Sequence, residues 1–410
     1  MKANESVKNY AASVRMYTNY TVREIKKICK EIGPRIAGSE AEHKAHAHLA
    51  EQMKSCCDEV AVEEFTVARE ALMSFIRVCG ILVAIAMVFS FVNLPVVALV
   101  VSVIAAVCLV CEFGMYKQFY DVFFKKYQSH NAIGVRKAAG ETKQRIIFSG
   151  HVDSSHEWTF THLGGAPLLY VAGVWAIVGM LYCLVYAILA TFNVGSEELL
   201  TVLKYVQIAF IPGVICAIIF INFRRTVEGA NDNLTGAVSS IAIMKYLEDN
   251  NIRFENTEVI CMATGSEESG LRGAKDYAKR HHDELTEIPT IFIGLETFRD
   301  YDNISICKRD LSGTVSMDAR VSKLVKKAGE DAGVDLPYIS VYLGASDAAA
   351  IQQSGVPAVT LSAMNPGPPR YYHTRRDTAD NMNIKTVEKC LDIALRALFI
   401  YDEEGLKEEY

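Results

Sequence analysis

The sequence predicts an α/β protein with a mostly parallel or mixed central sheet flanked by helices, into which two transmembrane helical hairpins are inserted. Short apolar runs of strand length alternate with amphipathic stretches of helix length, as in sheets built from strands and crossover helices. Long uncharged runs interrupt this alternation. About 20 apolar residues are enough to cross a bilayer as a helix.

The soluble elements follow from local pattern in chain order. Residues 37–54 should form a helix with Ser39 as its N-cap. Alternation or apolar runs predict strands at 59–67, 131–137, 145–150, 257–264, 290–296, 338–343 and 356–364. Helical spacing predicts helices at 232–249, 271–285, 321–333 and 384–404.

The uncharged runs predict four membrane spans. They cover 34 residues from Val78 to Cys111, 34 from Leu163 to Ser196 and 19 from Tyr205 to Phe223. We expect spans at about 74–93, 95–114, 168–191 and 204–223. The first pair is short unless Arg77 reaches the interface, so a re-entrant or interfacial hairpin is the alternative there.

These spans divide the chain into five segments. Residues 1–70 hold N-terminal helices and the first strand, 71–115 the first hairpin, 116–162 further strands, 163–223 the second hairpin and 224–410 the rest of the α/β pattern. Because both hairpins interrupt that pattern, they are expected to be loops of one domain rather than an appended anchor.

Composition agrees with a membrane protein. Of 410 residues, 50% are hydrophobic and 22% are charged. The net charge of −6 argues against a nucleic-acid partner. The 11 cysteines are scattered, five of them within the expected spans, which favours reduced thiols over a disulfide framework. The N-terminal stretch has no apolar segment typical of a signal peptide.

Histidines and carboxylates follow several expected strands, where the strands end or a loop begins. Ligand sites in parallel sheets lie at the carboxyl ends of the strands, so these side chains should meet at one edge. Imidazoles with carboxylates are ligands that suit divalent metals, zinc above all. The candidates are His151, Asp153, Asp232, Glu267, Glu268, Glu296 and His373.

At these residues the chain resembles the co-catalytic di-zinc aminopeptidases of clan MH, a family that includes aminopeptidase Y, bacterial leucyl aminopeptidase and glutamate carboxypeptidase II. The matching pieces occur in the family's order and cover residues 33–400 apart from the spans. They are "GPRIAGSEAEHKAHAHLAEQM", "NAIGVRK", "GHVDSS", "GANDNLTG", "SEESGLRGA", Glu296, "GASDAAAIQQSGVPAVTL" and "YYHTRRDT". The resemblance implies a zinc-exopeptidase-like fold.

The resemblance also implies two zinc ions bridged by Asp232. His151 and Glu296 would complete the protein ligands of one ion, and Glu268 and His373 those of the other.

Two further carboxylates receive roles from the resemblance. Asp153 would accept the free N–H of His151 and so fix the tautomer of that ligand. Glu267, next to a ligand but not itself one, would be the general base that takes the proton of a metal-bridged water.

Some neighbouring residues depart from the family's motifs, and others are expected to have no direct role at the metal site. Ala348 stands where the family often has histidine, which affects the pocket rather than metal binding. Asp377 is expected to orient its loop. His43, His46 and His48 do not converge on one helix face and are expected to be solvated. Candidate anchors for a substrate carboxylate, or simply surface charges, are Arg299, Arg370, Arg375 and Arg376.

The favoured function is a membrane-embedded zinc metallopeptidase of aminopeptidase type. An N-acyl amino acid amidohydrolase and a glutaminyl cyclase-like enzyme on the same fold are alternatives. A non-catalytic receptor or scaffold is another, although such proteins usually lose metal ligands and this sequence keeps five of them and the base.

The charges beside the spans predict orientation. The ends next to the α/β part carry Arg69, Arg77, Lys117, Lys125, Lys126, Arg224 and Arg225. The opposite connections carry Lys204, Glu197 and Glu198. The positive-inside rule therefore places the catalytic part in the cytoplasm, and the expected location is the cell membrane.

The second hairpin should leave the sheet at the edge that carries the metal site, so that the site lies close to the bilayer. Hydrophobic peptides or amides would be concentrated there, since each buried methylene contributes about 0.8 kcal/mol to partitioning. The alternative is that the spans only tether an ordinary cytosolic aminopeptidase.

Overall fold

The computed structural model describes residues 1–119 and 121–410, and at its centre lies a nine-stranded mixed sheet. The strand order is β1-β2-β6-β3-β7-β11-β8-β10, with β9 paired to β8. Strands β6, β3, β7 and β11 are mutually parallel, while β1–β2, β2–β6 and β11–β8 are antiparallel. The bounds are β1 (Glu59–Val67), β2 (Tyr127–Arg136), β3 (Gln144–His151), β6 (Thr257–Thr264), β7 (Thr290–Glu296), β8 (Ile304–Asp310), β9 (Val315–Ser316), β10 (Tyr338–Ser340) and β11 (Ala358–Ala363). The predicted mixed α/β fold is therefore confirmed.

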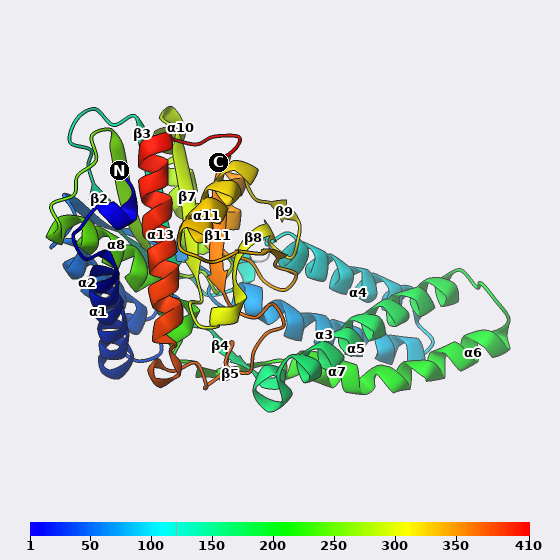
Figure 1. The fold of residues 1–410 in the computed structure, drawn as a ribbon. Helices are drawn as coiled ribbons and strands as arrows, with labels where there is room; N and C mark the ends of the chain where they lie inside the picture. The colour runs from blue at the N-terminus through cyan, green and yellow to red at the C-terminus, as the bar shows by residue number, and fades with distance from the viewer. Residues whose placement is uncertain (120) are drawn as a thin grey trace.

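Helices cover both faces of this sheet. One face packs against α1 (Tyr10–Glu31), α2 (Glu40–Met53), α8 (Thr235–Asp249), α11 (Ala319–Asp331) and α13 (Ile384–Glu404). The other packs against α9 (Arg272–Arg280), α10 (His282–Glu287) and α12 (Asp347–Gln353). Figure 1 shows α1 and α13 beside each other on the first face.

The strand β3 shows why its sequence is a continuous apolar run. Ile146 and Phe148 belong to the core on the α8 and α13 face, and Ile147 belongs to the core on the α9 and α12 face. Successive side chains of a strand point to opposite faces, so a strand covered on both sides needs apolar residues at every position.

Most predicted elements are found, several with unchanged bounds. β1, β6, β7 and α13 begin and end where the sequence predicts. Ser39 caps α2, its Oγ accepting the Glu42 N–H at 3.1 Å. The single helix expected over 271–285 is wrong, because the structure divides it into α9 and α10 at His281. The strand expected over 338–343 contains only the three residues of β10.

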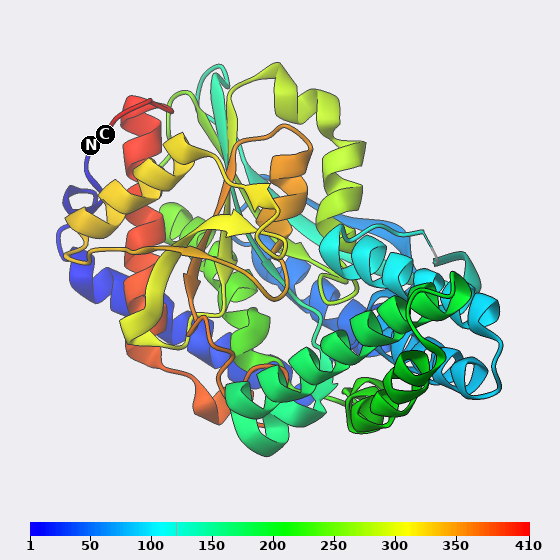
Figure 2. The ribbon, with the colours of Figure 1, turned by 90° about the vertical axis from the view of Figure 1, so that its right-hand side faces the viewer.

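Among the described residues, four helices are long and apolar enough to cross a membrane. Figure 1 shows them extending from one side of the sheet-containing part. Figure 2 is turned by 90°, so that this bundle of helices faces the viewer. They are α3 (Ala71–Phe91), α4 (Pro95–Cys108) continued by the π-helix η2 (Leu109–Gly114), α5 (Thr159–Thr191), and a helix of Glu197–Ile218 formed by α6 (Glu197–Val206), η4 (Gln207–Phe210) and α7 (Ile211–Ile218).

The expected bounds of the last two spans are wrong. Helix α5 begins at Thr159 rather than near 168, with a kink at Gly165. The fourth span begins at Glu197 and ends at Ile218 instead of running from 204 to 223. The reason is a two-stranded ribbon of β4 (His156–Trp158) and β5 (Ile221–Thr226), which pairs the backbone at the base of the second hairpin.

Arg77 lies at this base as well. Its guanidinium donates to the carbonyl oxygens of Ile218 at 3.2 Å and Ile221 at 3.4 Å, so it satisfies acceptors where α7 ends.

Candidate metal centre

All seven predicted site residues lie at one edge of the sheet. His151 ends β3 and Glu296 ends β7, while the loop after β6 carries Glu267 and Glu268. His373 follows β11. Because β3, β6, β7 and β11 are parallel, their carboxyl ends meet, as the sequence predicts.

Asp232 lies between the two histidines. Its Oδ1 is 3.2 Å from His151 Nε2 and its Oδ2 is 3.0 Å from His373 Nε2. His373 Nε2 is also 3.0 Å from Glu268 Oε1, and His151 Nε2 is 3.9 Å from Glu296 Oε1.

Two groups of potential ligands therefore share one carboxylate. The ligand atoms of His151, Asp232 and Glu296 lie within 4.8 Å of one another, and so do those of Asp232, Glu268 and His373. A third group joins His151 to Glu267 and Glu268. The first two groups are the ligand sets that the family resemblance implies.

The surroundings of these atoms suit bound cations. Asp232 Oδ2 and Glu268 Oε1 are buried, and among the described residues no well-aligned hydrogen bond reaches them, although His373 Nε2 lies 3.0 Å from each. Although burial opposes a charged imidazole, Glu268 and Asp232 raise the pKa of His373 to about 10. Burial raises the pKa of Glu296 to about 8. An excess of buried carboxylates is costly unless positive charge compensates it, and imidazole with carboxylate is a typical zinc donor set.

Asp153 contacts both His151 and the loop of the adjacent carboxylates. Its carboxylate accepts the backbone N–H groups of Glu267 at 3.0 Å and Glu268 at 3.1 Å. The hydrogen bond of His151 Nδ1 goes to the backbone carbonyl of Asp153 at 3.1 Å, while the nearest carboxylate oxygen is 3.5 Å away. Asp153 therefore fixes the Glu267–Glu268 loop as well as the ring of His151.

Two residues hold the bridging loop and the end of β7. Asp377 accepts the backbone N–H groups of Asn231 at 2.8 Å and Asp232 at 3.1 Å, so it orients the loop of Asp232, whereas the sequence predicts only that it orients its own loop. Asn233 Nδ2 donates to Glu296 Oε2 at 3.0 Å.

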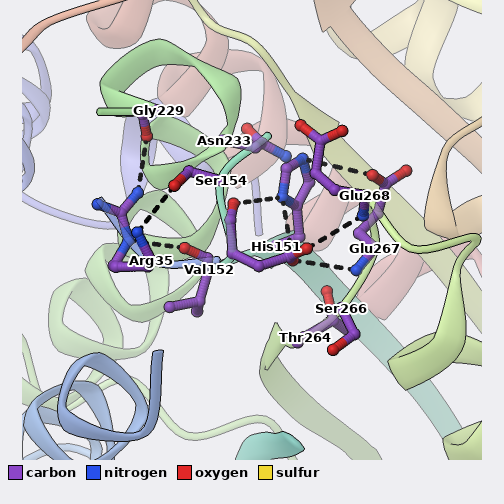
Figure 3. Close-up of polar contacts among 12 residues, drawn as sticks. Arg35, His151, Val152, Ser154, Gly229, Asn233, Thr264, Ser266, Glu267 and Glu268 are labelled. Atoms are coloured by element: carbon purple, nitrogen blue, oxygen red, sulfur yellow. Dashed lines mark hydrogen bonds and ion pairs between the residues drawn. The ribbon is translucent and has the colours of Figure 1, made fainter. Parts of the chain in front are cut away.

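Arg35 is a buried element of the centre that sequence reasoning missed. Its fully buried guanidinium donates to the carbonyl oxygens of Val152 at 2.7 Å, Glu228 at 2.9 Å and Gly229 at 2.9 Å. Figure 3 shows it between the chain that follows His151 and the loop that leads to Asp232. It lies in the quoted motif "GPRIAG", but its carbonyl partners are distant in sequence and leave no local signal.

Glu42 is the second residue missed. This buried carboxylate accepts the Ser266 N–H at 3.0 Å and the Gly38 N–H at 2.7 Å, and so supports the start of the Glu267 loop from helix α2. On the same helix, the expectation that His46 is solvated is wrong, because it is fully buried between α2 and its neighbours.

Aromatic side chains form the side of the centre that faces the apolar helices. Tyr372 stacks on His373 with ring centroids 3.9 Å apart, and Trp158 meets the same imidazole edge to face at 4.5 Å. Trp158 belongs to β4, at the foot of the second hairpin. The hairpin is therefore continuous with the wall of the metal centre.

A cavity opens beside these groups, which we name the catalytic cavity. It measures about 80 Å³. It is lined by Leu72, Met73, Phe75, Ile76, Phe113, Tyr116, Trp158, Phe220, Glu267, Glu268, Leu343, Gly344, Ala345, Tyr372 and His373. The carboxylates and His373 are its polar end, and the remaining wall is mostly apolar.

Three of the four candidate arginine anchors are engaged elsewhere. Arg375 pairs with buried Glu157 at 2.6 Å, and Arg299 donates to Asp300 at 3.0 Å. Arg370 donates to the carbonyl oxygens of His162 and Leu163 at 3.3 and 3.2 Å. None of the four is among the residues that line the catalytic cavity.

Comparison with known proteins agrees with this geometry. Residues 218–398 match the model of "Peptidase family M28", and this segment carries Asp232, Glu267, Glu268, Glu296 and His373. No curated protein sequence matches the chain.

Solved structures share the fold at low identity. BSAP, a zinc aminopeptidase from Bacillus subtilis, has a TM-score of 0.57 at 14% identity, covering 96% of this chain and 96% of that chain. An aminopeptidase from Aneurinibacillus sp. strain AM-1 has a TM-score of 0.55 at 15% identity, covering 94% and 93%. A glutaminyl cyclase from Bacteroides thetaiotaomicron has a TM-score of 0.54 at 14% identity, covering 95% and 97%. The chain thus has the fold of solved zinc aminopeptidases and glutaminyl cyclases, and its residues 218–398 are similar to peptidase family M28.

Proposed function

We propose that the protein is a membrane-embedded exopeptidase-type amide hydrolase, an aminopeptidase in the first instance, that uses two zinc ions. The observation that carries this proposal is the pair of ligand groups that share Asp232, His151–Asp232–Glu296 and Asp232–Glu268–His373. Paired divalent ions at such a site would activate the attacking water and polarise the scissile carbonyl.

Glu267 is the proposed general base. Its Oε2 lies 3.9 Å from His151 Nε2, at the polar end of the catalytic cavity. Burial raises the pKa of Glu267 well above its usual range. The charge of His151 opposes this shift, and the charges of Asp347 and Glu268 add to it. A carboxylate with a raised pKa can take a proton from water and deliver it to the leaving amine near neutral pH.

The bundle of apolar helices supports membrane embedding. Side chains on its outer surface are apolar and exposed, for example Val96, Val171 and Val202 at 59% each. Exposed apolar surface of this extent fits lipid rather than water as its surroundings. The basic residues beside the α/β part support a cytoplasmic orientation of the catalytic part.

The second hairpin reaches the metal centre through Trp158, so hydrophobic or membrane-associated peptides are the proposed substrates. A glutaminyl cyclase-like enzyme is the second candidate, favoured by the fold shared with glutaminyl cyclases. Both ligand groups of the present chain have their full set of side chains, which favours the two-zinc hydrolase.

A substrate library tests this function. The full-length protein in lipid nanodiscs would be incubated with peptides and N-acyl amino acids, and products would be identified by mass spectrometry. We expect loss of one terminal unit from apolar members, and no products after chelation of the metal. Cyclised N-terminal glutamine as the main product would support the second candidate, and no product at all would support a non-catalytic receptor.

A further inference from the structure

The catalytic cavity continues into the membrane bundle. A second cavity of about 130 Å³, which we name the bundle cavity, lies between α3, η2, α5 and α7. The two cavities share Phe75, Ile76, Phe113, Phe220 and Leu343 in their walls. They are therefore consecutive parts of one passage that starts at Glu267 and His373.

The bundle cavity has an apolar wall. Its lining consists of aliphatic, aromatic, glycine and sulfur-containing side chains, among them Val83, Met180 and Val214. Its one weak donor, Cys79 Sγ, already faces the Ala105 carbonyl oxygen at 3.4 Å. Among the described residues that line it, an occupant would find no free hydrogen-bonding side chain to replace water.

The passage is long compared with an amino-acid side chain. Along α3 its lining residues extend from Leu72 in the catalytic cavity to Val83 in the bundle cavity. Eleven helical steps of 1.5 Å correspond to about 16 Å. A chain that advances roughly 1.2 Å per bond, as an extended backbone does, needs about 13 bonds to cover that length.

We propose that the passage binds the unbranched alkyl chain of a long-chain N-acyl amide, with an acyl group of roughly 12 to 14 carbons. This inference rests on the proposed function, because it assigns the passage to the substrate that is hydrolysed at the metal centre. Hydrolysis breaks the amide C–N bond, adds the hydroxyl of water to the acyl carbon and places the proton on the departing amine.

An alkyl chain fits the passage better than a peptide. An extended peptide would bury N–H and C=O groups without partners, at a cost of several kcal/mol for each group in an apolar medium. A helix satisfies its own backbone but is about 10–12 Å across with its side chains, as wide as each of the helices between which the bundle cavity lies. Methylene groups need no partner, and each contributes about 0.8 kcal/mol on burial.

The acyl side of the amide is the part that enters. An exopeptidase cleaves a terminal unit from its substrate. The remaining part, on the amine side of the bond, can be of any length and therefore needs an open path to solvent. The bundle cavity instead lies among apolar helices, and the described residues that line it offer no polar path for a leaving peptide. The terminal acyl unit is therefore the part that this passage can hold.

Two substitutions within the bundle cavity and one outside it test the proposal. A Cβ atom added at Gly173 would meet no atom within 4 Å, so Gly173→Leu extends into open space from the cavity wall. Ala176→Phe, one turn further along α5, would place a phenyl ring in the bundle cavity. Val174→Phe is the control, since Val174 is 58% exposed and does not line the cavity.

The assay uses the full-length zinc-loaded protein in nanodiscs, with N-acyl glycines of 4 to 16 acyl carbons and leucine p-nitroanilide. We expect kcat/KM to rise at least tenfold from the 4-carbon to the 12-carbon acyl chain. Gly173→Leu and Ala176→Phe should remove most of that rise and spare the shortest substrate, while Val174→Phe keeps the wild-type profile. A flat series, or a rise that neither cavity variant alters, would overturn the inference.

A second readout is independent of turnover. An N-dodecanoyl glycine with a terminal diazirine should, on irradiation, label the Glu267→Gln variant at or beside Val83 or Met180, and unlabelled N-dodecanoyl glycine should compete. Labelling confined to outward residues such as Val174 would contradict the proposal. Hydrolysis of the short substrates without chain dependence would refute only the passage, whereas no hydrolysis of any substrate would refute the proposed function.

Discussion

His151 Nε2 lies 3.2 Å from Asp232 Oδ1, although 81 positions separate the two residues in the sequence. The intervening chain contains the second apolar hairpin and its supporting ribbon β4–β5. The hairpin therefore begins and ends beside the metal centre, and movement of one is expected to affect the other.

Replacing the proposed base separates chemistry from metal binding. Glu267→Gln should lower kcat by about 10²–10⁴-fold, because the amide cannot accept the proton of water. Zinc content, measured by atomic spectrometry, should stay near that of the wild type. Asp232→Ala is the matched opposite and should lose metal. Near-normal turnover of the Gln variant would show that another group is the base.

Asp377 should control metal affinity without contacting the metal. Asp377→Ala removes the acceptor that holds the backbone N–H groups of Asn231 and Asp232. Loss of such an orienting partner typically lowers metal affinity about 10–100-fold. Competition with a chromophoric chelator measures the change, and an unaltered affinity would exclude this role.

Arg35 should be essential to the stability of the centre. Arg35→Ala would leave several buried carbonyl oxygens without a donor, at a cost of about 3 kcal/mol or more. Thermal unfolding of the zinc-loaded protein in detergent should show a clearly lowered midpoint. Arg376→Ala, at an exposed position close to the same centre, is the control and should leave the midpoint nearly unchanged. Equal midpoints of the two variants would contradict the structural role of Arg35.

His46 should make stability depend on pH. Burial lowers the pKa of His46 to about 4, from an ordinary value of 6.5. Between these values the unfolded chain binds a proton that the folded chain does not, so folding weakens as the pH falls from 6.5 towards 4. The full difference corresponds to about 3 kcal/mol.

Unfolding midpoints at several pH values measure this dependence. His46→Leu should flatten it over that window, whereas His282→Leu, at an exposed position, should keep the wild-type slope. An unchanged slope in His46→Leu would assign the dependence to other groups.

Orientation can be tested with introduced cysteines. The native residues Cys307 and Cys390 are buried, so thiol labelling at these positions would not report the side of the membrane. Glu51→Cys, on an exposed surface of α2, should react with an impermeant reagent only after cell lysis. Glu198→Cys, at an exposed position in the first turn of α6, should react in intact cells. The reverse pattern would place the catalytic part outside.

The sequence predicts the sheet well because its signals are local. β6, buried on both faces, and α13, with its helical repeat of apolar residues, have the predicted bounds. Strand ends at one edge likewise predict the meeting of His151, Glu268 and His373. These inferences need only periodicity and the rule that parallel strands end together.

Other features depend on contacts between distant segments. Residues 221–226 continue an uncharged run as far as Phe223, yet they form β5 because His156–Trp158 is available to pair with them. The burial of His46 and the carbonyl partners of Arg35 likewise arise only when separate segments pack together. The sequence does not predict strand β8, and it predicts helix α1 only as one of the N-terminal helices of residues 1–70, without bounds. Tertiary packing commonly overrides local preference in this way.

The zinc content of the full-length protein tests the central claim most directly. The two ligand groups that share Asp232 predict two zinc ions per chain after purification without chelator and equilibration with excess zinc, falling below two in Glu268→Ala. Atomic spectrometry against protein concentration from amino-acid analysis gives the ratio. Two ions per chain is the result that this account predicts, whereas one ion or none would contradict it.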